Sequence, residues 1–189
     1  MNLERLKATI REHKQELVSK IEKVSDDIEV ISMIAGLTEE CLREGKKVMW
    51  AGNGGSATQA SHYAAELVGR YKKKRAPYKS ISLSVDLGAI TCIANDYGYA
   101  EVFSRQVEAL GDPEDLLIVM STSGLSCNIV NAVKVAKTKG IRVVGLLGGD
   151  GGSVKDICDI IYIVDSKETS IIQEVHGHIC HIICEYSEG

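Results

Sequence analysis

The hydrophobic pattern of the chain changes at about residue 45, and this change limits the fold more than any other feature. Beyond it, short apolar runs rich in β-branched residues alternate with stretches of helical periodicity. Runs that are apolar throughout are typical of strands in a parallel sheet with helices on both faces. The sequence therefore predicts an α/β fold, a three-layer sandwich around a five-stranded parallel sheet. The expected strands are residues 47–51, 80–83, 116–120, 142–147 and 160–164, and the expected helices are 59–70, 99–110, 128–139 and 170–186.

The residues before this change have a helical pattern of their own. Leu3, Leu6 and Ile10 begin a series of apolar positions at helical spacing that continues to about residue 45. Residues 25–27, Ser-Asp-Asp, suit a cap between two helices. Two helices are therefore expected ahead of the sheet. We interpret residues 1–45 as a helical oligomerisation segment and residues 46–189 as the sheet part of a single domain that spans 1–189.

Composition narrows the classes of function. The formal net charge of −4 favours neither nucleic acid nor an acidic membrane as a partner. Apolar runs fall short of the roughly 20 residues that a membrane span needs, and the first residues lack a signal-peptide pattern. A cytoplasmic protein with reduced, mostly buried cysteines is expected. The basic run at residues 72–75 suits a solvated loop, with contact to a phosphate or a partner as the alternative.

Two polar loops follow predicted strands and precede predicted helices, at residues 52–56 and 121–126. Both loops follow the carboxyl ends of strands, so in a parallel sheet they lie at the same edge. Ligands of open α/β sheets bind at this edge. Four hydroxyls in the second loop suit a phosphate held by neutral donors. The first loop is glycine-rich, which allows close backbone approach to a ligand or simply a tight structural turn. The polar candidates in the two loops are Asn53, Gly54, Gly55, Ser56, Ser121, Thr122, Ser123 and Ser126.

Histidines and carboxylates gather on two of the predicted helices. His62 and Glu66 are four residues apart and share a helix face. They could form a solvated polar pair, bind a divalent metal, or supply an acid and a base. The last helix adds Gln173, His176, His178 and His181. Its two cysteines, Cys180 and Cys184, are either metal ligands or buried thiols. Gln173 and His181 lie about 12 Å apart along one helix, so they share a ligand only if Gln173 precedes the regular helix or two subunits contribute.

Taken together, these segments resemble the sugar isomerase (SIS) domain family and, within it, the phosphoheptose isomerases. The resemblance covers nearly the whole chain, including the two leading helices. Two departures are Leu125, where the family commonly has asparagine, and Leu87-Gly88, where a Thr-Ser or similar pair is usual. The matching segments are residues 51–57 (Ala-Gly-Asn-Gly-Gly-Ser-Ala), 62–66, 69–71, 94–99 (Ala-Asn-Asp-Tyr-Gly-Tyr), 121–124 with Ser126 and Asn128, and 172–174 with His176 and His181.

The resemblance implies a flavodoxin-like SIS fold and a role for each candidate residue. By resemblance, the hydroxyls of Ser121, Thr122, Ser123 and Ser126 hold the substrate's phosphate. The sugar is lined by Asn53, Gly54, Gly55, Ser56, Asn95 and Asp96, and Arg70 fixes either the substrate or Glu66. Zinc is held by His62, Glu66, Gln173 and His181, of which Glu66 and Gln173 also face the substrate. A homotetramer with active sites at subunit interfaces is implied as well.

The implied reaction converts sedoheptulose 7-phosphate to a heptose 7-phosphate through an enediol, at the entry to nucleotide-activated heptose synthesis. Such a step needs one group to remove a carbon-bound proton and another to return one. We assign Glu66 as the base and His181 as the acid. If both coordinate zinc throughout the reaction, neither is free for proton transfer, and the sequence leaves this conflict open. The alternatives are a non-catalytic SIS protein that binds a protein partner, as in the replication-initiator-associating relatives, and an isomerase or sensor of another sugar phosphate.

Overall fold

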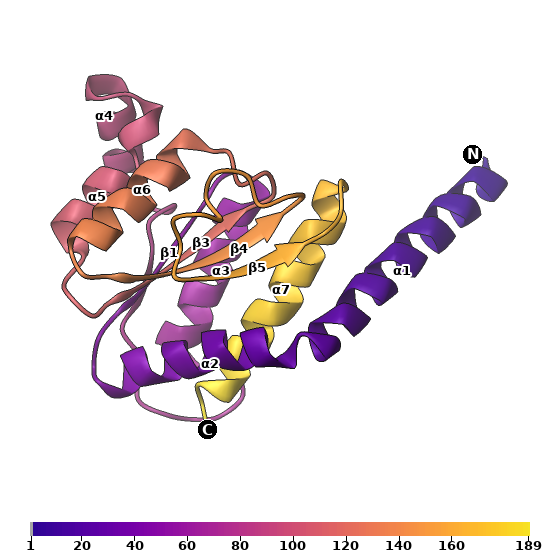
Figure 1. Ribbon diagram of the computed structural model, residues 1–189, viewed down its shortest axis with the longest axis horizontal. Helices are drawn as coiled ribbons and strands as arrows, with labels where there is room; N and C mark the ends of the chain where they lie inside the picture. Colours follow the sequence, from indigo (N-terminus) through magenta and orange to yellow (C-terminus); the bar gives the residue numbers. More distant parts are fainter. Residues whose placement is uncertain (1) are drawn as a thin grey trace.

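A computed structural model describes residues 2–189 and contains the predicted five-stranded parallel sheet (Figure 1). Its strand order, β2-β1-β3-β4-β5, is that of flavodoxin-like folds. Each neighbouring pair is parallel. The predicted fold class is thereby confirmed. The strands are β1 (Val48–Gly52), β2 (Ser80–Ser82), β3 (Leu116–Ser121), β4 (Arg142–Gly148) and β5 (Ile160–Val164).

Helices cover both faces of the sheet, because alternate strand residues point to opposite sides. Val48 and Trp50 of β1 pack into the same cluster as α2 (Ile28–Arg43), α3 (Gly55–Val68) and α7 (Thr169–Tyr186). The intervening Met49 and Ala51 pack on the other side, with α5 (Ser104–Leu110) and α6 (Cys127–Thr138). Buried apolar residues on β1, β3, β4 and β5 thus hold the three layers together.

The two N-terminal helices are present as predicted. Helix α1 (Leu3–Asp26) ends at Asp27, whose backbone N–H donates to the carbonyl of Lys23, and α2 begins one residue later. The start of α1 extends away from the sheet layers (Figure 1). There Leu3, Leu6 and Ile10 are exposed. Among residues 2–189, no helix combines the length and apolar character required to cross a membrane.

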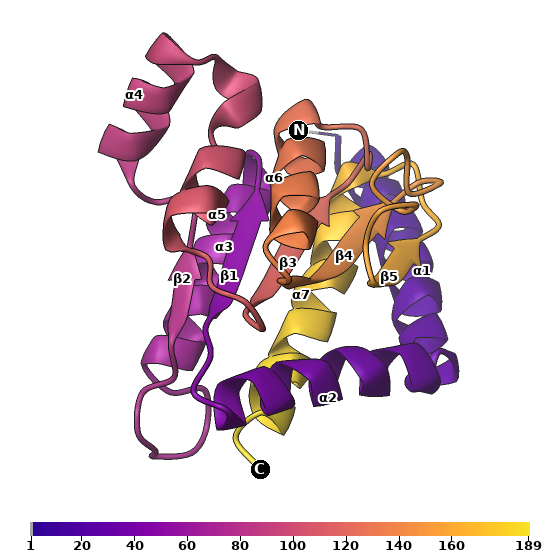
Figure 2. The same ribbon diagram turned by 60° about the vertical axis from the view of Figure 1, so that its left-hand side comes forward.

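The region between β2 and α5 differs from the prediction. Residues 87–96 form a helix, α4 (Leu87–Asp96), which the sequence analysis did not expect, and Figure 2 shows it projecting beside α5. Asp86 starts it by accepting a hydrogen bond from the N–H of Ala89 at 2.9 Å. The expected single helix over 99–110 is instead a 3₁₀ turn, η1 (Tyr99–Glu101), followed by α5.

Candidate active site

The two polar loops lie side by side at the carboxyl edge of the sheet. Strands β1 and β3 are neighbours, and Gly52 at the end of β1 is paired with Met120 near the end of β3. The loops that leave these strands enclose a small cavity of about 60 Å³. Its lining is predominantly polar and comprises Asn53, Ser56, Met120, Ser121, Thr122, Ser123, Ser126 and Gln173. The structure thus brings the predicted phosphate-binding hydroxyls and two residues of the first loop to one place.

The hydroxyl-rich loop is ordered from within. The Ser121 hydroxyl accepts a hydrogen bond from the N–H of Gly124 at 3.0 Å, and the Ser123 hydroxyl accepts one from the N–H of Leu125 at 3.2 Å. Ser126 is the N-cap residue of α6, and its hydroxyl makes no capping hydrogen bond within the described chain. The partial positive charge of a helix N-terminus favours an anion at this point. The loop therefore presents hydroxyls and the N-terminus of α6 to the cavity.

Gly124 allows a second, glycine-rich loop to brace the hydroxyl-rich loop. Its φ is +61°, and a Cβ at this position would come within 2.0 Å of the carbonyl oxygen of Gly151. The N–H of Val154 also donates to the carbonyl of Gly124 at 3.1 Å. The glycine-rich loop at residues 148–152 therefore supports the candidate phosphate site from behind.

Asn53 is held by residues that the sequence analysis gave no role. Its side-chain amide forms two reciprocal hydrogen bonds with that of Asn128, each 2.9 Å long. The Tyr99 hydroxyl donates to the Asn53 side-chain oxygen, also at 2.9 Å. Asn53 thus joins the two loops and the 3₁₀ turn. Neither Asn128 nor Tyr99 could have been found from its own sequence neighbourhood, since their partners lie far away in the chain.

Gln173 belongs to the cavity between the loops. It lies inside α7, so the expectation that it could precede the regular helix is wrong. Its side chain rests on Gly55, where a Cβ would come within 2.5 Å of the amide nitrogen. Its backbone carbonyl accepts a hydrogen bond from the Gln59 side chain at 2.8 Å, which ties α7 to α3.

Three of the four predicted metal ligands converge below the cavity, between α3 and α7. The Nε2 atoms of His62 and His181 are 3.2 Å apart, and Glu66 Oε1 lies 3.4 Å from His62 Nε2. One ligand atom from each residue lies within 4.8 Å of the others. Gln173 is eight residues before His181 in α7, about 12 Å along the helix axis.

The three residues fit a divalent metal such as zinc. Two ligands at about 2.0–2.1 Å from a tetrahedral ion are roughly 3.3 Å apart, close to the separation of the two imidazole nitrogens. Partial burial and the neighbouring His62 lower the pKa of His181, so its imidazole is neutral and able to donate a lone pair. Two imidazoles beside a carboxylate are a typical zinc-binding set.

The remaining predicted residues lie outside this arrangement. Asn95 and Asp96, which the resemblance places around the sugar, are the last residues of α4; they are exposed and hydrogen-bond to each other. Arg70 is exposed after α3, and its nearest polar partner is the carbonyl of Lys72 at 3.5 Å. Neither Arg70 nor the α4 pair is among the described residues that line the cavity. Asn95 and Asp96 lie away from the cavity because they end helix α4, whereas the two polar loops follow strands at the carboxyl edge of the sheet.

The cysteines of α7 are core side chains. Cys180 and Cys184 are fully buried among the apolar residues of α3 and α7. Burial raises the pKa of Cys184 to about 12, so the thiol stays protonated. Their interpretation as buried thiols, rather than as soft-metal ligands, is supported.

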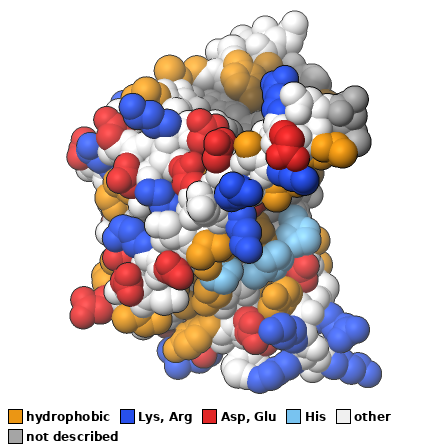
Figure 3. All heavy atoms as spheres, turned by 90° about the vertical axis from the view of Figure 1, so that its right-hand side faces the viewer, with side chains coloured by type: hydrophobic (Ala, Val, Ile, Leu, Met, Phe, Trp, Pro, Cys, Tyr) orange, Lys and Arg blue, Asp and Glu red, His pale blue; other side chains and the backbone are white. Residues whose placement is uncertain are grey.

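Histidine side chains gather on one face of the molecule, beside apolar and basic side chains (Figure 3). His62 contributes to the exposed part of the site, since 52% of its side chain is accessible. A metal held here would therefore be open to solvent in a single chain.

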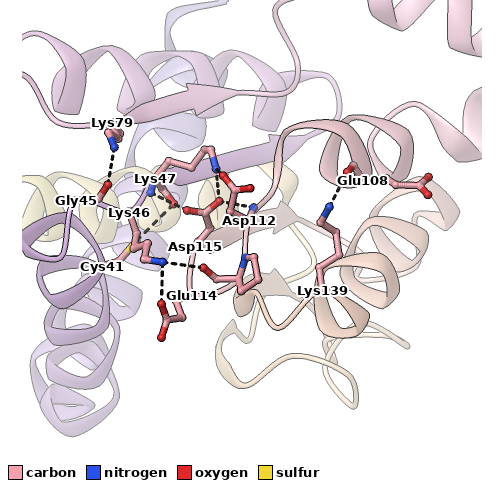
Figure 4. A network of polar contacts seen from close by, with 11 residues as sticks. Cys41, Gly45, Lys46, Lys47, Lys79, Glu108, Asp112, Glu114, Asp115 and Lys139 are labelled. Carbon is pink, nitrogen blue, oxygen red and sulfur yellow. Dashed lines mark hydrogen bonds and ion pairs between the residues drawn. The ribbon is translucent and has the colours of Figure 1, made fainter.

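A second polar network lies at the opposite, amino edge of the sheet (Figure 4). The carboxylate of Asp115, just before β3, accepts hydrogen bonds from the N–H groups of Lys47 and Asp112 at 2.9 and 2.8 Å. The Lys47 side chain pairs with both aspartates. Partial burial would lower the pKa of Lys47, but these two partners outweigh it and raise the pKa. This network fixes the starts of β1 and β3 and lies far from the candidate ligands.

Comparison with known proteins identifies the family of the chain. The SIS domain family matches residues 11–148. A phosphoheptose isomerase of Aliarcobacter butzleri is 47% identical over 173 residues, which cover 92% of this chain and 90% of that protein. One from Nitratiruptor is 47% identical over 182 residues, 96% of each chain. The structure of phosphoheptose isomerase GmhA from Neisseria gonorrhoeae has a TM-score of 0.90 at 36% identity, covering 100% of this chain and 99% of that one.

A flavodoxin-like sheet with a hydroxyl-lined cavity at its carboxyl edge and an adjacent His-Glu-His cluster defines an SIS-domain enzyme. Within that class the chain belongs to the phosphoheptose isomerase family, whose members match it over nearly its full length. The resemblance inferred from the sequence motifs is confirmed, and so is the assignment of the chain as an isomerase.

Proposed function

We propose that this isomerase converts sedoheptulose 7-phosphate to D-glycero-D-manno-heptose 7-phosphate, the first step of nucleotide-activated heptose biosynthesis. The observation that carries the proposal is the hydroxyl-lined cavity next to the cluster of His62, Glu66 and His181. A sugar phosphate needs both parts, an anchor for its phosphate and acid–base groups at its reacting carbons. The names of the similar proteins support the same substrate class.

In the proposed mechanism, the hydroxyl-rich loop binds the phosphate and so places C1 and C2 of the sugar at the His-Glu-His cluster. Glu66 removes a proton from C1, and the neutral imidazole of His181 donates its ring N–H proton to the carbonyl oxygen at C2, which gives the enediol. Return of the proton to C2 and loss of the C1 hydroxyl proton give the aldose. Oε1 of Glu66 faces His62, which leaves Oε2 for proton transfer. Zinc held by these residues supplies a Lewis acid that polarises the carbonyl and stabilises the enediolate.

We further propose a homotetramer with active sites at subunit interfaces, in which residues 1–45 serve as the oligomerisation segment of a single domain that spans 1–189. Two observations support it. Leu3, Leu6 and Ile10 are exposed on a helix that extends away from the sheet layers. The separation of Gln173 from His181 leaves the fourth proposed zinc ligand to a second subunit. A cytoplasmic location remains part of this proposal.

The test is turnover of sedoheptulose 7-phosphate by purified protein, followed by NMR of the sugar, with and without a chelator. We expect conversion in the wild type and loss of nearly all of it in Glu66→Gln, which keeps the size of the side chain but cannot accept the proton. Absence of conversion by the wild type would refute the substrate, and a fully active Glu66→Gln would refute the assignment of the base. Activity that survives complete metal removal would refute the role of zinc alone.

A further inference from the structure

The backbone at the basic run, residues 72–75, binds the carboxylate of a residue more than 100 positions later in the sequence, Glu188. Glu188 accepts hydrogen bonds from the N–H groups of Tyr71, Lys72 and Lys73, each 2.8 Å long. Only 1% of the Glu188 side chain is exposed. Burial by itself would raise the pKa of Glu188, but the three N–H donors and Arg75 outweigh it and lower the pKa to about 2. The carboxylate is therefore ionised and fully used as an acceptor.

Arg75 extends this contact to the end of α3. Its Nε lies 3.2 Å from Glu188 Oε1, while its two terminal nitrogens donate to the carbonyls of Leu67 and Glu66 at 2.8 and 3.0 Å. These carbonyls belong to the last turn of α3, where they lack partners within the helix. The Arg75–Glu188 pair thus joins the ends of the two helices that carry the proposed metal ligands.

The turn held by Glu188 carries an aromatic ring that lies on the site. The rings of Tyr71 and His181 are stacked, with centroids 5.3 Å apart and an angle of 21° between their planes. Tyr63 and His62 meet the same imidazole edge-on, at 5.1 and 5.4 Å. Both of those rings are fixed on α3, whereas Tyr71 lies beyond its end. The backbone N–H of Tyr71 is one of the three groups that Glu188 binds.

We propose that Glu188, acting through the turn at residues 71–75, holds Tyr71 against the imidazole of His181 and is thereby a positioning residue for the active site. Loss of the Glu188 carboxylate would leave the three backbone N–H groups and the Nε of Arg75 without their acceptor. The turn would then be free to move Tyr71 away, and the His181 ring would gain freedom of rotation. The effect of this orientation on turnover rests on the proposed function. The contact between the rings of Tyr71 and His181 is independent of that function.

Glu185, in the last turn of α7 and three residues before Glu188, provides a matched control. It pairs with the side chain of Lys72 at 2.8 Å, but 55% of its own side chain and 57% of that of Lys72 are exposed. Such surface pairs contribute little. Glu185 and Glu188 therefore place equal charges near the same basic run, and they differ in that only Glu188 binds the backbone of the turn.

The direct test is the ¹H–¹³C NMR signal of the His181 ring in full-length protein treated with chelator, at one fixed pH of about 8. In the wild type, the stacked ring of Tyr71 shifts this signal, which His181→Gln identifies by its disappearance. We expect Glu188→Ala and Tyr71→Leu to move the signal in the same direction, toward that of an unstacked histidine. Glu185→Ala and Tyr71→Phe should leave it in place. If Glu188→Ala does not fold, Glu188→Gln takes its place.

A His181 signal that is unmoved in the folded Glu188 variant would overturn the proposal. So would a signal that moves equally in Glu185→Ala. Kinetics give a second readout: we expect kcat to fall about 10- to 100-fold in the Glu188 variant, as small misplacements of catalytic groups do, with KM within about twofold. If the wild type does not turn over the heptose phosphate, the proposed function fails, and the NMR comparison still decides the role of Glu188.

Discussion

The Nε2 atoms of His62 and His181 lie 3.2 Å apart, although 119 positions separate the two residues in the sequence. Two imidazole nitrogens lie this close when one ring donates a hydrogen bond to the other or when both rings face an ion. The nearby carboxylate of Glu66 favours the ion, because it adds a third ligand of the opposite charge. The pair is thus the structural basis for the metal predicted at this site.

We therefore expect His62→Ala to lose most of its bound zinc. Removal of a residue that only orients a ligand weakens metal binding about 10- to 100-fold, and loss of a ligand itself should cost at least as much. Metal content after dialysis, measured by plasma mass spectrometry, checks this. His178→Ala is the control, because His178 is an exposed histidine of α7, the helix that carries His181, and lies outside the cluster. Equal zinc content in both variants would contradict the assignment.

A second prediction concerns the Ser126 hydroxyl, which lines the cavity without capping α6. Ser126→Ala should raise KM for the sugar phosphate about 10-fold or more, since a hydrogen bond to a charged group contributes about 1.5–3 kcal/mol. Because the phosphate is held equally in the ground state and the transition state, kcat should change by no more than about twofold. Initial rates over a range of substrate concentrations separate the two constants.

Ser170→Ala is the control for that substitution, since Ser170 is exposed in the first turn of α7 and outside the cavity. Inhibition by inorganic phosphate offers an independent check, and it should weaken in Ser126→Ala alone. A fall in kcat at constant KM would instead place Ser126 among the groups that act only in the transition state.

Much of this architecture could be predicted from the sequence because the strands are buried on both faces and flanked by helices with a clear apolar stripe. Helix α4 was not predicted: its ten residues are mostly apolar and none is fully buried, although Ile90, Ile93 and Ala94 pack against the core. His62 and Glu66 could be paired by their spacing on one helix. Their meeting with His181 came from the family resemblance, since no local pattern encodes a contact between α3 and α7. Glu188 had no signal at all, because backbone N–H donors leave no trace in the side-chain sequence.

A third prediction tests how Gly124 is packed. Gly124→Ala combines a positive φ with a Cβ that would come within 2.0 Å of the Gly151 carbonyl oxygen. Gly45→Ala shares the positive φ, +72°, but its Cβ would have nothing within 4 Å. Strain at positive φ costs about 1 kcal/mol or more in both, and Gly124→Ala adds the steric conflict. We expect it to lower the melting temperature more than Gly45→Ala, at about 2–4 °C per kcal/mol for a chain of this size.

The two glycine variants should also differ in their KM for the sugar phosphate. Displacement of the hydroxyl-rich loop by Gly124→Ala should also raise KM for the sugar phosphate, whereas Gly45 lies at the amino edge of the sheet, next to Lys46 and Lys47. Thermal unfolding and initial rates on the same preparations measure both effects. Equal melting temperatures and equal KM values would contradict the role of the second loop as a support.

The last prediction concerns acid stability and His176, which is fully buried below the cavity. One ring nitrogen, Nε2, lies 3.0 Å from the carbonyl oxygen of Leu147, and the other, Nδ1, has no partner among the described residues. Burial lowers the pKa of His176 to about 4, against the weaker opposing effect of the hydrogen bond to Leu147. The folded protein therefore keeps this imidazole neutral under conditions in which the unfolded chain, with an ordinary pKa of about 6.5, binds a proton.

The titration of His176 therefore changes the free energy of unfolding only below about pH 6.5. Above about pH 6.5 the imidazole is neutral in both states, and it has no effect on the free energy of unfolding. As the pH falls toward 4, the unfolded state gains a proton that the folded state does not bind, and unfolding becomes easier by an amount of order 3 kcal/mol. His176→Gln can keep the hydrogen bond to Leu147 but does not titrate. The advantage of the wild type over this variant in urea unfolding should therefore shrink between pH 6.5 and 4, and an advantage that stays constant would show that His176 is protonated equally in both states.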